Sequence, residues 1–412
     1  MFDIKLHTPE GVKDYLPEEC RFKKEIENKI ESAFNSYAYL PVKSPTFEFA
    51  QVFDGMGSLA QSQTYKFVDR DGSVLALRSD MTSAIARIVA TAYDEAALPL
   101  RLYYIENCFR YNKDYQGKLR EFTQAGVELI GVNSVEADAE VLSLAVNSLL
   151  NAGARGFRID VGHVQFLDGL LEQANISDEI KSKIQKSIVD RNYVEVEAIV
   201  DCLDIEEKLK DFLSELPLLI GGMEVIEKAK AVAGNPKSLN ALEHLVKLYE
   251  ILSGCGLEEY ICFDLGITGD LDYYTGIILR GYILKSGFTI ISGGRYDKLS
   301  ETYGASYPSV GFSIKINNLL YAFEMNQNED KTILFGYKKE SEISALSNAD
   351  LLRKNGKCLK NSMLSSLDEV VELGRKSGVR YVLFFDNQAT MVDLKDNSRK
   401  EASMDMLLNL EV

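Results

Sequence analysis

The most informative part of the sequence is the stretch REFTQAGVELIG at residues 120–131. Gln124, Gly126 and Glu128 lie two positions apart in it, so on a β-strand their side chains point to the same face. An amide and a carboxylate around a glycine do not make a hydrophobic core, and the glycine leaves room for a ligand beside the backbone. The stretch therefore predicts a strand with one polar, ligand-facing side.

Neighbouring parts of the chain extend this strand into a sheet. Residues 102–111 also have the composition of a strand, and a polar loop containing glycine joins them to residues 120–131. Residues 39–49 are extended, but Pro41 and Pro45 limit them to an edge or irregular strand. Further strands are expected at residues 65–77 (a hairpin), 157–161, 260–265, 272–284 and 288–291. Apolar residues at helical spacing predict helices at 18–36, 81–93 and 135–152, the last of them amphipathic. The pattern indicates an α+β fold, with an antiparallel sheet flanked by helices.

The 412 residues of the chain are enough for two to three domains. From about residue 164 to 254 the pattern is mostly helical, and we interpret it as an insertion into the sheet domain. A charged link at residues 328–331 separates this larger domain, residues 1–326, from a tail at residues 331–412. Short strands and helices alternate in the tail, which predicts a small α/β domain.

Composition and charge argue against several classes of protein. The chain has 46 Lys and Arg against 62 Asp and Glu, and a net charge of −16 would repel a nucleic acid unless a local patch overrides it. The six cysteines are scattered and the three histidines are dispersed, which disfavours a disulfide framework or a metal site and fits a reducing cytoplasm. No run of 18 apolar residues occurs, so no membrane span is expected.

Polar residues near the ends of the predicted strands suggest an amino-acid pocket. Asp80 follows the hairpin where a helix begins, Arg110 lies on the partner of the 120–131 strand, and Tyr273 and Tyr274 add two phenols. Each also has an ordinary structural explanation: Asp80 as a helix cap, Arg110 in a buried ion pair, and the tyrosines in the core. Together they offer acidic partners for an ammonium group, and amide and phenol groups for a polar ring.

Residues 55–60 fit the string GxGxxA, which in a dinucleotide-binding fold closes a strand and opens a long helix. Here the string leads through a short polar stretch into the hairpin. We therefore interpret it as a turn and expect no cofactor.

Several motifs resemble those of histidyl-tRNA synthetase, a class II aminoacyl-tRNA synthetase. They are Phe109-Arg110-Tyr111, residues 120–124, residues 271–274, residues 293–297, the N-terminal residues 11–17, and Pro45. The resemblance covers about residues 5–320 and implies a class II synthetase-like fold that forms a homodimer through the strand around residues 41–49. Residues 378–383 resemble, more weakly, the anticodon-binding domain of the synthetase.

Four positions depart from the synthetase pattern. Gly269 and Asn318 stand where the family has arginines, one stabilising charge during carboxylate activation and one holding the ATP γ-phosphate. Thr123 replaces a histidine, and Lys118 replaces an arginine on the ATP side. Loss of a guanidinium aimed at developing charge typically costs about 10²-fold or more in rate. The departures argue against an efficient aminoacylating enzyme.

A synthetase-like chain that is catalytically inactive but still holds histidine resembles the regulatory subunits of ATP phosphoribosyltransferase, as do residues 80–82 and 159–164. This resemblance implies a hetero-oligomer with the short-form catalytic phosphoribosyltransferase subunit, in the first step of histidine biosynthesis, with feedback inhibition by L-histidine. It implies no tRNA partner, no metal and no catalytic residue in this chain. The residues expected to bind histidine are Asp80, Thr82, Arg110, Gln124, Glu128, Tyr273 and Tyr274.

Two alternatives are a functional histidyl-tRNA synthetase and a histidine-sensing module of the stress-kinase type, although the sequence contains no kinase motif. In the pocket we expect Asp80 and Gln124 to bind the α-ammonium group, and Glu128 with one tyrosine to bind the imidazole. Adjacent residues on a regular strand face opposite ways, so Tyr273 and Tyr274 can both reach the ligand only where the chain is irregular.

Overall fold

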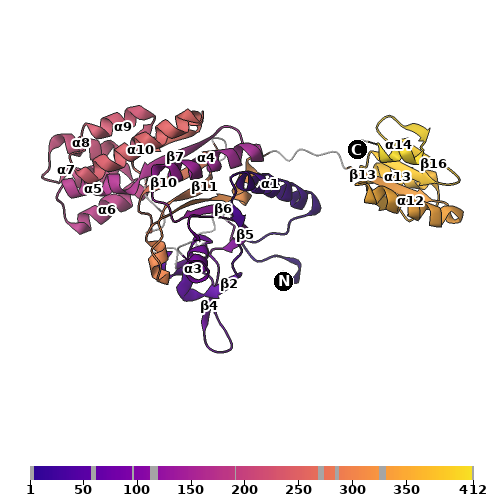
Figure 1. Cartoon of the computed structure of the whole chain (residues 1–412), viewed down its shortest axis with the longest axis horizontal. Coiled ribbons are helices and arrows are strands. Elements are labelled where there is room, and N and C mark those ends of the chain that lie inside the picture. Colours follow the sequence, from indigo (N-terminus) through magenta and orange to yellow (C-terminus); the bar gives the residue numbers. More distant parts are fainter. Residues whose placement is uncertain are drawn as a thin grey trace. The chain divides into compact units, whose positions relative to one another are not determined.

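The computed structural model describes residues 4–56, 62–94, 97–111, 119–190, 192–267, 273–283, 287–323 and 331–410. The chain divides into two compact units, Met1–Glu324 and Met325–Val412 (Figure 1). Within the described ranges, no helix has both the length and the apolar composition needed to cross a membrane.

A nine-stranded sheet forms the centre of the first unit, in the order β1-β5-β6-β12-β11-β10-β7-β9-β8. The six strands from β5 to β7 pair antiparallel, as the sequence predicts, whereas β1 and β9 pair in parallel with β5 and β7. The bounds are β1 Leu40–Pro41, β5 Leu100–Phe109, β6 Glu121–Ile130, β7 Phe157–His163, β8 Ile220–Gly221, β9 Ile261–Asp264, β10 Ile277–Ile283, β11 Thr289–Arg295 and β12 Ser309–Lys315.

One face of this sheet is covered by helices α1 (Pro17–Ser36), α4 (Val135–Ala152) and the short α11 (Ile316–Tyr321). The Ser134 side chain caps α4 by accepting a hydrogen bond from the Ala137 amide, and Gly153 ends the helix with φ 96°. The sequence predicts the bounds of α4, but not its surroundings. Twelve of its residues are buried, so it is covered nearly all round rather than amphipathic, since both α1 and an insertion helix pack against it.

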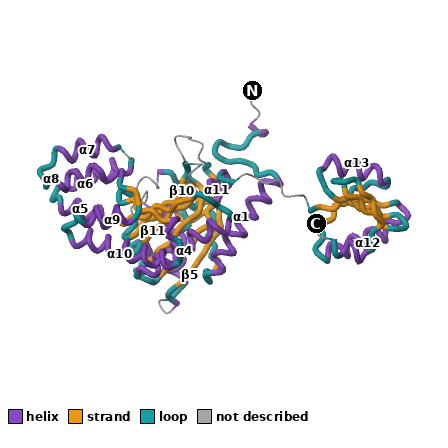
Figure 2. Tube along the Cα trace, turned by 90° about the horizontal axis from the view of Figure 1, so that it is seen from above, coloured by secondary structure: helices purple, strands orange, loops and turns teal. Residues whose placement is uncertain are grey.

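The predicted helical insertion lies between β7 and β9. In its described part it contains six helices: α5 Val164–Gln173, α6 Asp178–Val189, α7 Tyr193–Asp201, α8 Glu207–Glu215, α9 Met223–Lys230 and α10 Pro236–Gly254. Figures 1 and 2 both place these helices at one end of the sheet. The insertion is not wholly helical, because its two-residue strand β8 pairs with β9 at the edge of the sheet.

The other face carries α3 (Thr82–Ala92) and a three-stranded sheet in the order β2-β4-β3. These strands are β2 Phe47–Phe49, β3 Lys66–Val68 and β4 Val74–Leu77, and β3 with β4 forms the predicted hairpin, whose turn holds Gly72 at φ 92°. The 3₁₀ helix η2 (Ala50–Met56) contains the start of the GxGxxA string; residues 57–60 of the string lie outside the described residues.

Two predicted strands differ from the observed ones. The strand expected at residues 272–284 begins only at Ile277, because residues 273–275 form a turn, and residues 268–272 lie outside the described part. The strand expected at residues 288–291 continues to Arg295. Gly293 and Gly294 belong to this extension, because β10 and β12 pair with them on both sides and hold them in the sheet.

The second unit is a small α/β fold, as the sequence predicts. Its sheet has the order β14-β13-β15-β16-β17, with β13 parallel to both β14 and β15. Helices α12 (Glu342–Lys354) and α13 (Leu367–Ser377) lie on opposite faces of this sheet (Figure 2), each over its own apolar cluster. The other elements are β13 Thr332–Tyr337, β14 Cys358–Asn361, β15 Tyr381–Phe385, β16 Ala389–Asp393, β17 Ser398–Glu401 and α14 Met404–Leu408.

Candidate functional site

The polar face predicted for residues 120–131 lies on β6. Ala125 and Val127 are part of the main hydrophobic core, so the alternating residues Gln124, Gly126 and Glu128 face the opposite side of the sheet, toward α3. All three are buried. These residues therefore lie between the sheet and α3, and not on the open surface.

Glycines form the floor of this site. Glu128 lies opposite Gly311 on β12, and Gly311 lies opposite Gly294 on β11. A methyl group at Gly311 would overlap a carboxylate oxygen of Glu128, and one at Gly126 would overlap the hydroxyl of Tyr104. The absence of side chains at these three positions lets Tyr104, Glu128 and Tyr274 pack directly against the backbone of three neighbouring strands.

Glu128 is the most constrained charged group of the site, with 1% of its surface exposed. The Thr82 hydroxyl donates to its Oε1 at 2.8 Å, and the Tyr296 hydroxyl donates to its Oε2. Burial raises the pKa of Glu128 to about 8, the charge of Asp80 adds to the rise, and the two hydroxyls oppose it. Within the described residues no Lys, Arg or His pairs with this carboxylate. It is thus a buried acid whose countercharge the described chain does not supply.

Asp80 makes the contacts at the start of a helix that the sequence suggested for it, and Arg110 forms an ion pair with it. Its Oδ1 accepts hydrogen bonds from the amides of Thr82 and Ser83 at 2.6 and 3.4 Å, at the N-terminus of α3. Its Oδ2 lies 3.4 Å from the Nη2 atom of Arg110. Arg110 also donates a hydrogen bond from its Nε to the Ser79 carbonyl, at 2.8 Å. The carboxylate is therefore fixed in the pocket wall, beside a partly exposed cation.

Tyr273 and Tyr274 meet the condition set by the sequence, because they lie in the turn before β10 and not on a strand. Their ring centroids are 5.0 Å apart, and the Tyr273 ring is 5.7 Å from that of Tyr296 in an edge contact. The Tyr274 ring lies over Gly294, where a methyl group would be 2.8 Å from the ring. Tyr273 thus packs against Tyr296, the residue that donates to Glu128, and Tyr274 packs against Tyr273 and Gly294.

The structure brings the predicted residues together, but by different contacts. The Thr82 hydroxyl donates directly to Glu128, and Asp80 forms an ion pair with Arg110. Tyr273 contacts Tyr296, which donates to Glu128, and Tyr274 contacts Tyr273. Gln124 is held from the neighbouring strand, because the thiol of Cys108 donates to its Oε1 at 3.1 Å.

Two residues outside the predicted histidine-binding set belong to the site, Tyr104 and Tyr296, although Tyr296 lies in the quoted motif at residues 293–297. Tyr296 follows the end of β11, and only the pairing of β11 with β12 brings it to Glu128. Tyr104 faces Gly126 across β5 and β6 and is 2% exposed. The alternation of residues along β5 would have indicated Tyr104, whereas nothing in the local sequence indicates the direction of Tyr296.

The departures from the synthetase pattern carry structural contacts. Asn318 donates from Nδ2 to the Thr289 carbonyl at 2.8 Å, and its neighbour Asn317 accepts from the Thr123 amide at 2.8 Å and bonds to the Tyr15 hydroxyl. Gly269 and Lys118 lie outside the described residues. In the described ranges no three His, Cys, Asp or Glu side chains converge to hold a metal ion. The site therefore offers oxygens and phenols for a small ligand that carries N–H groups.

Comparisons with known proteins agree on one family. The family model described as histidyl-tRNA synthetase matches residues 11–319. The ATP phosphoribosyltransferase regulatory subunit of Caldanaerobacter subterraneus subsp. tengcongensis is 39% identical over 381 residues, which cover 90% of this chain and all of that protein. The protein of the same name from Ruminiclostridium cellulolyticum is 37% identical over 413 residues, covering 98% of this chain and 99% of the relative.

Solved structures with similar folds carry related descriptions. A structure from Bacillus halodurans, described as an ATP phosphoribosyltransferase regulatory subunit/histidyl-tRNA synthetase, has a TM-score of 0.83 and 31% identity, and the match covers 93% of this chain and 99% of that one. Histidyl-tRNA synthetase from Nostoc sp. PCC 7120 also has a TM-score of 0.83, at 20% identity over 97% of each chain, which supports the fold alone. The class II synthetase-like fold expected from the sequence is confirmed.

Proposed function

The chain belongs to the family of ATP phosphoribosyltransferase regulatory subunits, and we propose that it senses free L-histidine in the pocket around Glu128. A regulatory subunit acts on a partner that carries the phosphoribosyltransferase activity. In our proposal that partner is the short-form catalytic subunit, and histidine bound to this chain reports the level of the pathway's end product.

The observation that carries the proposal is the buried carboxylate of Glu128, which receives only hydroxyl donors among the described residues. Burying a charge without a partner is costly, so such a group is expected where a ligand completes it. The imidazole of histidine supplies an N–H donor and, when protonated, a positive charge. The neighbouring phenols of Tyr273 and Tyr296 provide the remaining polar and aromatic contacts for a flat ring.

The other end of the ligand is assigned to Asp80, Gln124 and Arg110. The Asp80 carboxylate attracts the α-ammonium group, and the Gln124 amide oxygen can accept from the same group. Arg110 is 3.4 Å from Asp80, a long contact, and its side chain is 25% exposed. It is therefore available to pair with the ligand's carboxylate. Thr82 orients Glu128 and so acts on the ligand indirectly.

Regulation follows if histidine binds one state of the hetero-oligomer more tightly than the other. A shift of a two-state equilibrium is limited by this difference in affinity, and coupling of 1–3 kcal/mol is typical of allosteric proteins. The same linkage requires that the state of the catalytic subunit alters the affinity of this chain for histidine.

We further propose that the chain neither aminoacylates nor binds tRNA. Gly269 and Asn318 stand where the synthetase pattern has arginines, and Asn318 is engaged in a structural hydrogen bond. Residues 1–330 contain 33 Lys and Arg against 50 Asp and Glu, so the synthetase-like part is strongly acidic. Histidine-dependent pyrophosphate exchange at the rate of ordinary synthetases, about 1 s⁻¹ or faster, would contradict this proposal.

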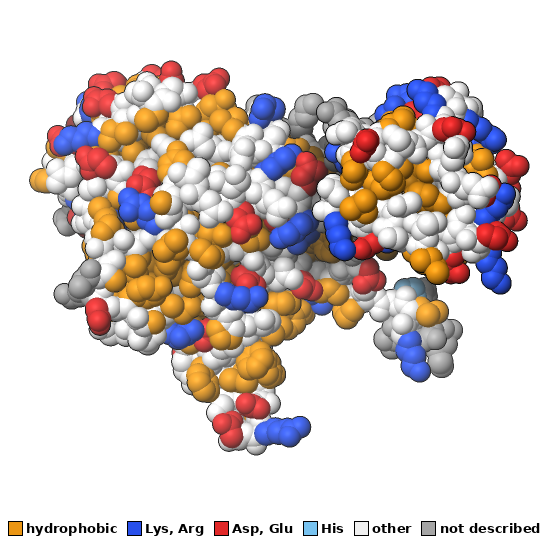
Figure 3. All heavy atoms as spheres, turned by 45° about the vertical axis from the view of Figure 1, so that its right-hand side comes forward, with side chains coloured by type: hydrophobic (Ala, Val, Ile, Leu, Met, Phe, Trp, Pro, Cys, Tyr) orange, Lys and Arg blue, Asp and Glu red, His pale blue; other side chains and the backbone are white. Residues whose placement is uncertain are grey.

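A homodimer through the region around residues 41–49 is also part of the proposal. Leu40, Phe47 and Phe49 are each more than half exposed. In Figure 3 hydrophobic side chains gather on the lower projection, above the charged turn of the β3–β4 hairpin. Apolar side chains grouped on a surface are typical of an interface. A stable monomer in light scattering at micromolar concentration would contradict the proposed homodimer.

A cytoplasmic location remains a prediction, which rests on the scattered cysteines.

Calorimetry tests the ligand. We expect the purified chain to bind L-histidine, and to bind at least one of the two ring N-methylated histidines much more weakly, because the methyl group removes the N–H that meets Glu128. In the complex with the catalytic subunit, Glu128→Ala should abolish feedback inhibition while assembly is retained. Wild-type protein that ignores histidine, both alone and in the complex, would refute the sensor function.

A further inference from the structure

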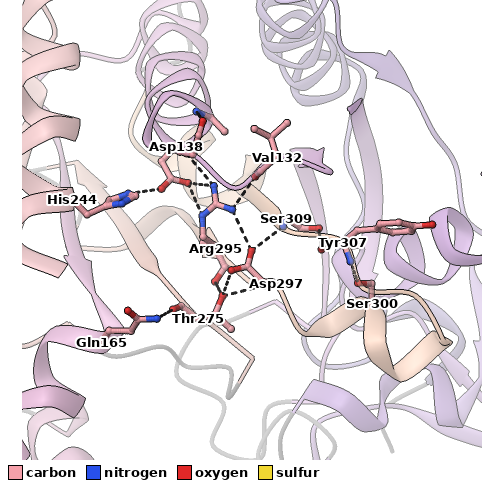
Figure 4. A network of polar contacts seen from close by, with 12 residues as sticks. Val132, Asp138, Gln165, His244, Thr275, Arg295, Asp297, Ser300, Tyr307 and Ser309 are labelled. Atoms are coloured by element: carbon pink, nitrogen blue, oxygen red, sulfur yellow. Dashed lines mark hydrogen bonds and ion pairs between the residues drawn. The ribbon is translucent and has the colours of Figure 1, made fainter. Parts of the chain in front are cut away.

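A second buried polar cluster lies behind the candidate pocket, between the sheet, α4 and the insertion (Figure 4). Asp138 on α4 is at its centre and is fully buried. The guanidinium of Arg295, at the end of β11, donates from Nε and Nη2 to Asp138 Oδ1 at 3.0 and 2.6 Å. His244 on α10 meets the other oxygen, with Nε2 2.7 Å from Oδ2. One carboxylate thus joins the core helix, the sheet and the insertion.

Arg295 is fixed by this cluster in every direction. Besides Asp138 it donates to the carbonyls of Val132 and Ser134, at 3.0 and 3.4 Å, and to Asp297 Oδ1 at 3.2 Å. Its side chain is 5% exposed. An arginine with all of its N–H directions engaged holds its own backbone in place, together with the flanking residues Gly294 and Tyr296 of the pocket.

The same segment fastens the turn that carries the two tyrosines. The Thr275 amide donates to the Arg295 carbonyl at 2.8 Å. The Thr275 hydroxyl donates to Asp297 Oδ2 at 3.0 Å and accepts from the Asp297 amide at 3.0 Å. Thr275 directly follows Tyr274, so the position of the tyrosine turn depends on residues 295–297.

The insertion holds this assembly from two helices. Gln165 on α5 donates from Nε2 to the Thr275 carbonyl at 3.1 Å, and His244 on α10 supports Arg295 through Asp138. His163, the last residue of β7, packs its ring against that of His244 with the centroids 5.5 Å apart. Burial lowers the pKa of His163 to about 4, so this ring is neutral at physiological pH.

We propose that Gln165 and His244 are positioning residues, through which the helical insertion sets the affinity of the pocket for its ligand. The inference rests on the proposed function for the identity of the ligand. Neither residue touches the pocket. Each instead holds the turn bearing Tyr273 and Tyr274, Gln165 directly and His244 through the Asp138–Arg295 pair. A partner that displaces the insertion would thereby change ligand affinity without entering the site.

The test compares Gln165→Ala, His244→Ala and His244→Gln in the full chain. The glutamine keeps an N–H donor at the position of the histidine Nε2. Glu250→Gln, at an exposed position on α10, is the matched control. We expect each alanine variant to weaken L-histidine binding in calorimetry by about 3- to 10-fold, as for one lost hydrogen bond. His244→Gln should restore most of the affinity, and the control should match wild type.

Hydrogen exchange at the Thr275 amide separates this inference from the proposed function. In ligand-free protein we expect faster exchange in both alanine variants and wild-type exchange in His244→Gln. If wild type does not bind histidine, the sensor function fails, but faster exchange still supports the positioning role. If wild type binds histidine and both alanine variants match it in affinity and in Thr275 exchange, the positioning role is refuted. Gln165 is exposed on α5, so its variant remains informative even if His244→Ala does not fold.

Discussion

Two buried carboxylates in the first unit, Asp138 and Glu128, have opposite surroundings. Asp138 is fully buried and contacts a guanidinium and an imidazole. Glu128 is 1% exposed and contacts two neutral hydroxyls. A buried charge is tolerated when the fold itself supplies its partner, and is costly otherwise. The difference predicts that Asp138 stabilises the fold, whereas Glu128, in our proposal, binds the ligand.

The largest expected effect on stability comes from removing Asp138 from its ion pair with Arg295. Asp138→Ala leaves the Arg295 guanidinium buried without its counterion, which should lower the free energy of unfolding by about 3–5 kcal/mol. Urea denaturation measures the loss, and hydrogen exchange in α4 assigns it to the first unit. Glu136→Ala, at an exposed residue of the same helix, is the control and should cost less than about 1 kcal/mol. An equal, small loss in both variants would mean that the pair does not support the fold.

For Glu128, which has no charged partner, we expect substitution to affect ligand binding and not stability. Burial raises the pKa of Glu128 to about 8, so near pH 7 Glu128→Gln replaces a mostly neutral acid and leaves no buried cation behind. We therefore expect unfolding of the ligand-free chain to be no easier than in wild type. Binding of L-histidine should weaken by about 30-fold or more, as for a charge-assisted bond in a desolvated pocket. Calorimetry and urea denaturation on the same sample give both quantities. A loss of stability comparable to that of Asp138→Ala would abolish the distinction between the two sites.

A smaller effect should come from filling the pocket floor. The added methyl group of Gly311→Ala would overlap the Glu128 carboxylate and the Val127 carbonyl, which should cost about 1–3 kcal/mol of stability and displace Glu128. Histidine binding should fall further than stability alone explains. Gly254→Ala is the control, because nothing lies within 4 Å of a methyl group there. Normal histidine affinity in Gly311→Ala would show that the floor is not part of the site.

The same contrast explains what could be predicted from the sequence. Alternation along residues 120–131 was enough to identify the polar face of β6, because period-two patterns report directly which side chains share a face. The type of each central element was also predictable, since Ser134 and Gly153 mark the two ends of α4. The departures Gly269 and Asn318 led, without any structure, to the prediction that the chain is not an efficient aminoacylating enzyme.

Long-range contacts were not predictable in this way. Tyr296 reaches Glu128 over 168 positions of sequence, and Arg295 reaches Asp138 over 157. Both contacts depend on the register of β11 against its neighbours, which no local pattern in the sequence reports. His244 reaches Asp138 only because the insertion folds back on α4, and no local pattern indicates that docking. The residues that complete the site are therefore those whose partners lie far away in the chain.

The smallest expected effect is a dependence of stability on pH, which tests whether Glu128 differs from Asp138 in lacking a charged partner. In the folded chain the pKa of Glu128 is raised from 4.5 to about 8, so the folded state holds this proton more tightly than the unfolded state. The resulting stabilisation is fully present below pH 4.5 and is lost as pH rises through 8. Between pH 6 and 8, ligand-free wild type should lose at most about 1.4 kcal/mol per pH unit relative to Glu128→Gln, which lacks the titrating group. Urea denaturation of both proteins at pH 6, 7 and 8 measures this difference. Parallel pH profiles would mean that Glu128 is already compensated in the free protein, as Asp138 is, and that its charge needs no ligand.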